Sequence, residues 1–270
     1  MAVYLTNSFE FGGTHQGSGA NITAGNSGGG NDNAFDVVTN STSNTTTYSN
    51  TVAHSGTYSM AMTLGSTAGI DYVQWSTSLT GSSLAQAWFR AYINCNGAYP
   101  AANIRVASFY DGATVAGGIT LLATSGKVES FDTAGTVAPV STNPVNLSGW
   151  TRLEGYVKAS LTAGSISYSI YLTPDSATPT ETETTATNLA TSSGITLIRL
   201  GNALSGATSY TYYLDDIGVS DTGYLGPSLY TGTGTGALTL AATSTGSKPS
   251  GVKARGFPAV IPVLEAADLI

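Results

Sequence analysis

The sequence predicts an all-β protein, an antiparallel two-sheet sandwich of the jelly-roll type followed by an extended C-terminal tail. Strand-like alternation of apolar and polar residues, with a period of two, recurs along the first 220 or so residues. No stretch of comparable length has the 3.6-residue period of an amphipathic helix. The composition agrees, because only 9% of the 270 residues are charged, against about 25% in an average globular domain. Gly, Ser, Thr, Asn and Ala take their place, which favours turns and strands over helices.

The clearest alternation lies at residues 85–93, where every odd position is apolar and the even positions carry Gln86, Trp88, Arg90 and Tyr92. This pattern predicts a strand with one buried face and one mixed face. The same pattern recurs at 150–158, where Leu153 and Val157 share the apolar face, and at 165–172. Further strands are predicted at 2–7, 35–38, 47–53, 57–64, 70–76, 103–111, 116–123, 127–132, 195–200 and 209–219. Many short strands joined by polar turns are typical of a jelly roll.

The chain is predicted to have three parts: a sandwich at 1–222, a Gly/Thr-rich linker at 223–251 and a docking tail at 252–270. A Gly/Thr tract such as Thr231–Gly236 cannot bury a core and should be extended. The end of the chain combines basic residues with the apolar side chains of Phe257, Val260, Ile261 and Leu264. A basic and apolar tail on an acidic body is suited to docking on another subunit, and the alternative is a disordered end.

Charge and cysteine content limit the possible functions. The formal net charge of −7 repels phosphates, so we expect no binding to nucleic acid. The single cysteine, Cys95, leaves no intrachain disulfide to form. The residues from Met1 to Leu5 run into a strand-like segment without the basic start of a signal peptide. No stretch approaches the roughly 18 apolar residues of a membrane span, so the sequence predicts assembly in the cytoplasm and no membrane insertion.

Three carboxylates lie beside strand residues in this charge-poor chain. Glu10 follows the predicted first strand, and Asp215 and Asp216 lie within the last. Carboxylates are disfavoured in a strand unless they have a partner. Calcium takes carboxylate and backbone oxygens as ligands, and the turn at 54–57 has carbonyl groups to offer. The alternative is that the two aspartates accept hydrogen bonds at a strand end or pair with Arg or Lys.

The mixed faces of two predicted strands hold a group of aromatic and charged side chains, namely Trp88, Arg90, Tyr92, Trp150, Arg152, Glu154 and Tyr156. Flat aromatic rings stack on sugars, and neighbouring polar groups bind the hydroxyls. The group is therefore a candidate carbohydrate-binding face. The alternative is that loops or a partner subunit cover these side chains.

The sequence does not favour an enzyme. Glycoside hydrolysis needs two carboxylates at a defined separation, whereas Glu181 and Glu183 lie in a loop rich in Pro and Thr. His15 and His54 stand in no arrangement typical of nucleophilic catalysis. Cys95 has no partner at a zinc-binding spacing.

Three motifs point to a family. Asn7–Glu10, His54–Met60 and Tyr213–Val219, joined by Trp150–Val157, resemble the jelly-roll carbohydrate-binding modules and the related concanavalin A-like or laminin-G-like domains. The resemblance covers residues 1 to about 222 and is specific for the fold and loose for the ligand. In such modules a structural calcium often joins the first strand, an early turn and the last strand. The resemblance therefore implies a Ca²⁺ site formed by Glu10, Asp215 and Asp216, with backbone oxygens near Ser55 and Thr57.

The low-complexity end of the chain adds a second resemblance. A lectin-like sandwich followed by a Gly-Thr repeat such as Thr231–Gly236 resembles minor tail or capsid decoration proteins of tailed phages, in particular of actinobacterial phages. It implies a non-enzymatic virion protein, assembled in the host cytoplasm, that docks on other virion subunits through its tail. We also expect a homo-oligomer and contacts with host-surface glycans. The alternatives are a free carbohydrate-binding module and, less favoured, a glycoside hydrolase.

Overall fold

The computed structural model describes residues 4–10, 17–29, 32–67, 69–76, 83–184, 189, 191–206 and 209–228. These residues form fifteen β-strands and no helix. The described residues therefore include no helix that could cross a membrane.

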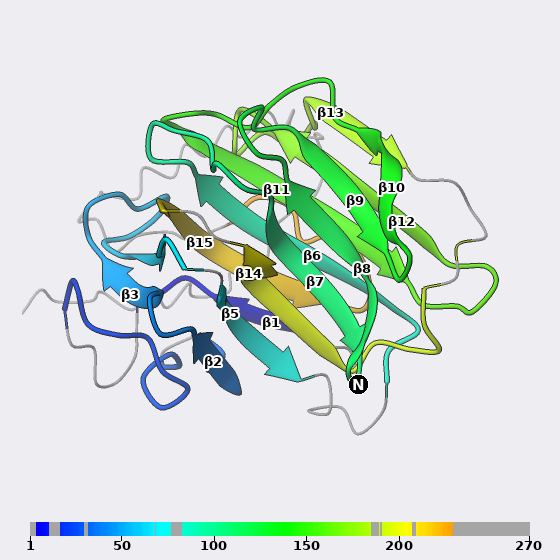
Figure 1. The fold of residues 1–270 in the computed structure, drawn as a ribbon, viewed down its shortest axis with the longest axis horizontal. Coiled ribbons are helices and arrows are strands. Elements are labelled where there is room, and N and C mark those ends of the chain that lie inside the picture. Colours follow the sequence, from blue (N-terminus) through cyan, green and yellow to red (C-terminus); the bar gives the residue numbers. More distant parts are fainter. Residues whose placement is uncertain are drawn as a thin grey trace, which may run out of the picture. The chain divides into compact units, whose positions relative to one another are not determined.

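The strands form two antiparallel sheets that pack face to face, one behind the other in Figure 1. The eight-stranded sheet has the order β13-β12-β11-β6-β15-β4-β3, and β1 pairs with β15 beside this path. Its strands are β1 (Tyr4–Asn7), β3 (Thr45–Ser49), β4 (Ser59–Leu64), β6 (Gln86–Asn94), β11 (Trp150–Lys158), β12 (Ser165–Tyr171), β13 (Glu181–Thr184) and β15 (Tyr210–Ser220). The seven-stranded sheet has the order β10-β9-β8-β7-β14-β5-β2. Its strands are β2 (Val37–Asn40), β5 (Gly69–Ser76), β7 (Ile104–Asp111), β8 (Thr114–Leu121), β9 (Val128–Asp132), β10 (Gly135–Val140) and β14 (Leu197–Gly206). The prediction of a jelly-roll β-sandwich is confirmed.

The predicted alternation places the core correctly. Between the sheets lie the apolar residues at the odd positions of β6 and those of the facing strands, including Ala87, Phe89, Ala91, Ile93, Leu153, Val157, Ile166 and Ile170. The even positions of β6 and β11 therefore point away from the core, because successive side chains of a strand face opposite sides. The register of the two strands places Trp88 opposite Tyr156, Arg90 opposite Glu154 and Tyr92 opposite Arg152.

The first and last strands meet, as the sequence predicts. β1 pairs antiparallel with the second half of β15, from Tyr4 opposite Ser220 to Asn7 opposite Ile217. The first half of β15 pairs instead with β4. One edge of β15 thus changes partner near Asp215 and Asp216, which places these aspartates beside the gap between β4 and β1.

Two strands differ from the sequence prediction. β10 lies in a segment for which no strand is predicted, and β13 lies within residues 173–187, which the sequence predicts to be a loop. The loop prediction is wrong for Glu181–Thr184, which pairs with β12 from Ile170 to Ser167. The carboxylate of Glu181 also accepts hydrogen bonds from the backbone amides of Thr142 and Asn143 at 2.5 and 2.8 Å. This short edge strand is held by its backbone and by one carboxylate, without an apolar face.

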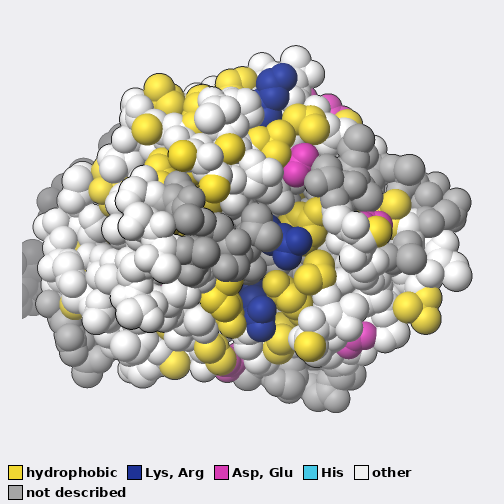
Figure 2. All heavy atoms as spheres, in the orientation of Figure 1, with side chains coloured by type: hydrophobic (Ala, Val, Ile, Leu, Met, Phe, Trp, Pro, Cys, Tyr) yellow, Lys and Arg dark blue, Asp and Glu magenta, His cyan; other side chains and the backbone are white. Residues whose placement is uncertain are grey.

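The outer face of the seven-stranded sheet carries basic side chains set among aromatic rings. Figure 2 shows basic side chains among hydrophobic ones on the face that lies over this sheet. The guanidinium of Arg199 lies 4.4 Å from the ring centre of Tyr72 and 4.2 Å from that of Tyr110, and the guanidinium of Arg105 lies 4.1 Å from that of Phe131. Such cation–π contacts hold the long side chains flat against the sheet.

The chain divides into two compact units, residues 1–232 and 233–270. The described part ends at Ser228, so most of the predicted linker and the whole predicted docking tail lie outside it. The predicted docking residues Phe257, Val260, Ile261 and Leu264 are among those outside. The partition at 222 and 251 therefore stays a prediction.

Candidate functional site

The acidic pair of β15 lies in a β-bulge. Asp215 is opposite Tyr92 on β6 and Gly218 is opposite Arg90, so two residues of β15 face one residue of β6. Asp216 has a φ of 44°, in the left-handed region that few non-glycine residues adopt. Because of the bulge, two successive carboxylates contact different groups: Asp215 accepts from backbone amides and Asp216 contacts the His54 ring.

The three predicted metal ligands converge on one turn, residues 54–58. Oδ2 of Asp215 accepts hydrogen bonds from the amides of His54 and Ser55 at 2.7 and 3.3 Å, and Oδ1 accepts one from the amide of Asp216 at 2.7 Å. Oε1 of Glu10 accepts hydrogen bonds from the amides of Thr57 and Tyr58 at 2.7 and 2.6 Å. Turn amides buried away from water need such acceptors, so the first and last strands are joined through this turn.

Glycine is required at position 56 of this turn. Gly56 has a φ of 65°, and a Cβ there would lie 2.3 Å from the carboxyl carbon of Glu10. The turn and the carboxylate can therefore approach closely only because residue 56 has no side chain.

Burial disfavours the charged form of the carboxyl groups in this region. Burial, and then the neighbouring Asp216, raise the pKa of Asp215 well above its usual range. Burial also raises the pKa of Glu10, and the two amide hydrogen bonds oppose this shift. A bound cation would relieve the same cost, and oxygen atoms such as Oε2 of Glu10 are the ligands that calcium takes.

The groups nevertheless do not form a recognisable metal cluster. Within the described residues, no three or more His, Cys, Asp or Glu side chains are grouped so that they could hold a metal ion. The hydrogen bonds to Ser55 and Thr57 use their amides, not the carbonyl oxygens that a calcium would need. The calcium ion stays a prediction.

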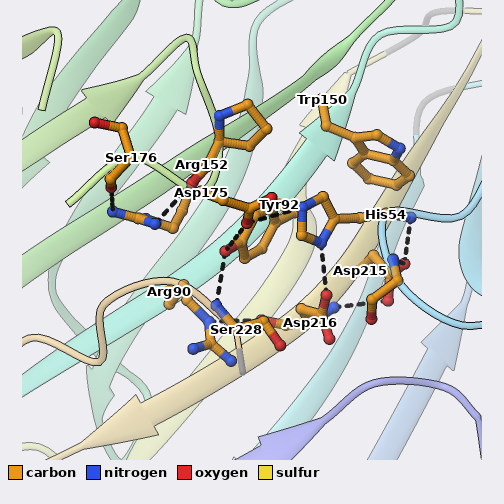
Figure 3. Close-up of polar contacts among 12 residues, drawn as sticks. His54, Arg90, Tyr92, Trp150, Arg152, Asp175, Ser176, Asp215, Asp216 and Ser228 are labelled. Carbon is orange, nitrogen blue, oxygen red and sulfur yellow. Dashed lines mark hydrogen bonds and ion pairs between the residues drawn. The ribbon is translucent and has the colours of Figure 1, made fainter. Parts of the chain in front are cut away.

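His54 connects the acidic pair to the outer face of the eight-stranded sheet (Figure 3). Its Nδ1 lies 2.7 Å from Oδ2 of Asp216, and its Nε2 lies 3.2 Å from Oδ1 of Asp175. Its ring stacks on Tyr92 with 3.7 Å between ring centres, and the Trp150 ring meets it edge-on at 5.9 Å. The imidazole is thus held by one buried and one exposed carboxylate, and Trp150 is half-buried beside it.

The centre of the predicted carbohydrate-binding face is closed. Arg90, Tyr92, Arg152 and Glu154, here called the closed centre, are each exposed to 5% or less. Arg152 lies 3.7 Å from the ring centre of Tyr171, and its Nε forms an ion pair of 3.4 Å with Glu154. Burial raises the pKa of Glu154 although two arginines oppose the shift. The side chains of the closed centre therefore contact one another and the segments of the chain that cover them.

Two segments of the chain cover this centre, and Figure 3 shows them meeting at Tyr92. From the 173–180 loop, the carbonyls of Pro174 and Ser176 accept hydrogen bonds from the Arg152 guanidinium at 2.7 and 2.8 Å. The Tyr92 hydroxyl donates to Oδ1 of Asp175 at 3.2 Å and accepts from the amide of Ser228 at 2.8 Å. A single phenol thus binds both covering segments at once.

The second covering segment, Tyr224–Ser228, is called the strap. Arg90 donates from Nη1 to the carbonyl of Gly226 at 3.1 Å and from Nε to the carbonyl of Asp216 in the bulge at 2.9 Å. Burial raises the pKa of Tyr92, and the hydrogen bond from Ser228 opposes the shift. The strap therefore rests on Arg90 and Tyr92, two of the predicted carbohydrate-binding residues.

One end of the face is more exposed than its centre. Trp88 and Tyr156, here called the platform, lie opposite each other on β6 and β11 and are both half-buried. Their ring centres are 4.7 Å apart with 36° between the planes. The exposed Lys158 and the half-buried Gln86 lie opposite each other beyond them, and the Tyr156 hydroxyl donates to Gln86 at 3.4 Å.

The structure thus divides the seven predicted carbohydrate-binding residues into a platform, a closed centre and Trp150. The groups at this face that the sequence did not predict include the His54 imidazole, Asp175, Tyr224 and Ser228. Tyr224, an aromatic residue four positions after the end of β15, was the available signal for the strap. Asp175 follows a proline in a polar loop, and nothing in the sequence near it indicates its partners.

Comparison with solved structures supports the fold assignment. The endo-β-1,4-glucuronan lyase from the fungus Trichoderma reesei superposes with a TM-score of 0.53 and 13% identity, over 80% of this chain and 94% of that chain. A protein of unknown function from Shewanella oneidensis MR-1 gives 0.51 and 14%, over 81% of this chain and 86% of that chain. The CBM22-1 xylan-binding domain from Paenibacillus barcinonensis Xyn10C gives only 0.38 and 14%, over 83% and 95%.

Identities this low show the fold alone. No protein-family model matches the chain, and no curated protein matches it. The class is therefore a jelly-roll β-sandwich of the kind present in the glucuronan lyase, and the role of the chain rests on its own residues.

Proposed function

We propose that this chain is a non-enzymatic glycan-recognition module that binds a polysaccharide on the outer face of its eight-stranded sheet. The observation that carries this proposal is the platform, two half-buried rings that lie opposite each other at the more exposed end of that face. Aromatic rings with a wet side favour stacking on the apolar face of a sugar. Gln86 and Lys158 beside them are donors for sugar hydroxyls.

The closed centre favours binding over catalysis. Tyr92 and Arg152 have the functional groups that polysaccharide chemistry would use, but they are exposed to 0% and 1%. Their hydrogen bonds go to the chain itself. A general acid or base must reach its substrate within hydrogen-bond distance, and neither residue does so while both segments cover it.

The platform is tested by replacing Trp88 with alanine. We expect affinity for the bound polysaccharide to fall on the order of tenfold or more, because a buried aromatic contact is lost. Tyr156→Ala should act in the same direction. The measurement is affinity electrophoresis in gels cast with soluble xylan, a β-1,4-glucan or glucuronan, with circular dichroism to confirm folding.

The control is Val37→Ala, because Val37 is an apolar residue that is 38% exposed and lies on β2 of the other sheet, away from the platform. It should migrate as the wild type does. Equal retardation of Trp88→Ala and the wild type by a polysaccharide that both bind would contradict a role for the platform.

We further propose that the module is displayed on a phage particle as a minor tail or capsid decoration protein. The support is the Gly-Thr tract Thr231–Gly236 and the basic, apolar end of the chain. Removal of residues 233–270, which form a separate unit, should abolish incorporation into particles and leave the sandwich folded. Incorporation is measured by immunoblotting of purified particles, and normal incorporation of the shortened chain would refute the docking role.

A further inference from the structure

The strap follows β6 in register. The Tyr224 ring meets Trp88 edge-on at 6.5 Å, the Gly226 carbonyl accepts from Arg90, and the Ser228 amide donates to Tyr92. Every second residue of the strap thus contacts every second residue of β6. The strap therefore runs along β6 from the platform to the closed centre, as an extended ligand chain would.

The strap is held weakly compared with the groups beneath it. Residues 225–228 are half-buried and Tyr224 is 49% exposed, whereas Arg90 and Tyr92 below are 5% and 0% exposed. Segments with few buried apolar contacts and exposed backbone open locally at low cost. The anchors are three backbone hydrogen bonds to the side chains of Arg90, Tyr92 and Glu154, the hydroxyl contact of Tyr224 with Ser167 at 3.0 Å, and the Leu225 side chain beside Gly218.

The strap uses the chemistry that a glycan offers. It presents a carbonyl oxygen to a guanidinium, an amide to a phenol oxygen and a ring edge to an indole. Sugar hydroxyls both donate and accept, so they can replace the carbonyl and the amide. A pyranose ring can likewise replace the Tyr224 ring on Trp88.

We propose that the strap is an intramolecular competitor of the polysaccharide, which extends from the platform along β6 by displacing residues 224–228. This rests on the proposed glycan-binding function. Only molecules in which the strap has opened can bind the polysaccharide along β6. The observed affinity is therefore the affinity of the open form multiplied by the fraction of molecules that are open. A substitution that weakens the strap and leaves Trp88, Arg90 and Tyr92 unchanged therefore strengthens binding.

Tyr224→Ala and Trp88→Ala test this with opposite expected signs, since they remove the two rings of one contact. Trp88→Ala weakens binding to the polysaccharide gel. Tyr224→Ala strengthens it, because the competitor loses its ring. If Tyr224 were instead part of the sugar-binding surface, both variants would bind more weakly.

Gly226→Ala weakens the strap through its backbone alone. Gly226 has a φ of 70°, and a Cβ there would meet nothing within 4 Å, so alanine adds only conformational strain. We expect affinity to rise roughly tenfold and exchange of the Ser228 amide to accelerate. Gly223→Ala is the matched control, because Gly223 also has free space around a Cβ but does not have a positive φ.

All variants are made in the full chain, with xylan, β-1,4-glucan and glucuronan gels as probes. Stronger binding by Tyr224→Ala and Gly226→Ala than by Gly223→Ala supports the strap as competitor. Unchanged or weaker binding by both, where Trp88→Ala loses binding, overturns it and leaves the glycan-binding function standing. Absence of binding by every protein, opened variants included, instead refutes the glycan-binding function itself.

Discussion

Replacement of Asp215 by alanine should destabilise the sandwich by about 3 kcal/mol or more, because three backbone amides lose their acceptor. These are the amides of His54, Ser55 and Asp216, and the Asp215 side chain is fully buried, so water cannot replace it without rearrangement. The change also loosens the turn that joins β15 to Glu10. The measurement is the free energy of unfolding from urea titration.

Asp215→Asn is the matched variant. The amide keeps one oxygen acceptor and removes the charge that burial disfavours, so its cost should be well below that of alanine. A loss within 1 kcal/mol for Asp215→Ala would contradict the role of this carboxylate as the acceptor for the turn.

The same proteins test the predicted calcium ion. If Ca²⁺ binds at Glu10, Asp215 and Asp216, chelation by EDTA lowers the melting temperature of the wild type, and added calcium restores it. Asp215→Ala should then no longer respond to EDTA. If EDTA leaves the wild type unchanged while Asp215→Ala still unfolds more easily, the carboxylate serves the backbone alone and the calcium prediction is wrong.

The sequence predicts the parts of this protein in which side-chain pattern determines position. The alternation in 85–93 and 150–158 identifies both the core face and the mixed face, because burial of one face fixes which residues point inward. Glu10, Asp215 and Asp216 indicate that the first and last strands lie together, because carboxylates are rare in this charge-poor chain. These features each leave a local trace in residue type.

The closure of the predicted carbohydrate-binding face leaves no such trace. Ser228 binds Tyr92 across 136 positions of the chain, and it does so through its backbone amide. The carbonyls of Pro174, Ser176 and Gly226 bind arginines in the same way. Because every residue has these backbone groups, composition and spacing cannot indicate which of them will cover a face. β13 escaped prediction for the same reason, since an edge strand with two polar faces is held by its backbone.

A second large effect is expected at Asp71, a fully buried carboxyl between the two sheets. Its Oδ1 lies 2.7 Å from the Thr46 hydroxyl, which lies 2.7 Å from Oδ1 of Asn40. The Thr46 hydroxyl has one proton and can donate to only one of these two oxygens at a time, whereas a protonated Asp71 could donate to Thr46 and leave the hydroxyl proton for Asn40. Its Oδ2 has no hydrogen-bond partner in the part of the chain that the structure describes. Burial accordingly raises the pKa of Asp71 to about 7.

The sign of the pH dependence follows from this shift. The folded-state pKa lies above the ordinary value of 3.8, so the folded state holds the proton more tightly than the unfolded state. The stability that the protonated carboxyl contributes is complete below about pH 4, decreases as pH rises toward 7 and is lost above it. A shift of this size corresponds to at most about 4 kcal/mol.

Asp71→Asn should remove the part of the pH dependence that Asp71 contributes. The asparagine amide can donate to Thr46 at every pH, as the protonated carboxyl does only in acid. We expect the variant to match the wild type near pH 4 and to exceed it by up to a few kcal/mol at pH 8. Urea unfolding of both proteins at pH 4, 6 and 8 gives the comparison.

Thr46→Val separates the carboxyl from its partner. Valine removes the hydroxyl but leaves Asp71 buried, and because burial is the main cause of the raised pKa, the loss of stability between pH 4 and pH 7 should persist in this variant. A wild-type slope that survives in Asp71→Asn and disappears in Thr46→Val would place the titrating proton elsewhere. A slope that disappears only in Asp71→Asn would mean that this single carboxyl makes the junction of the two sheets strongest in acid.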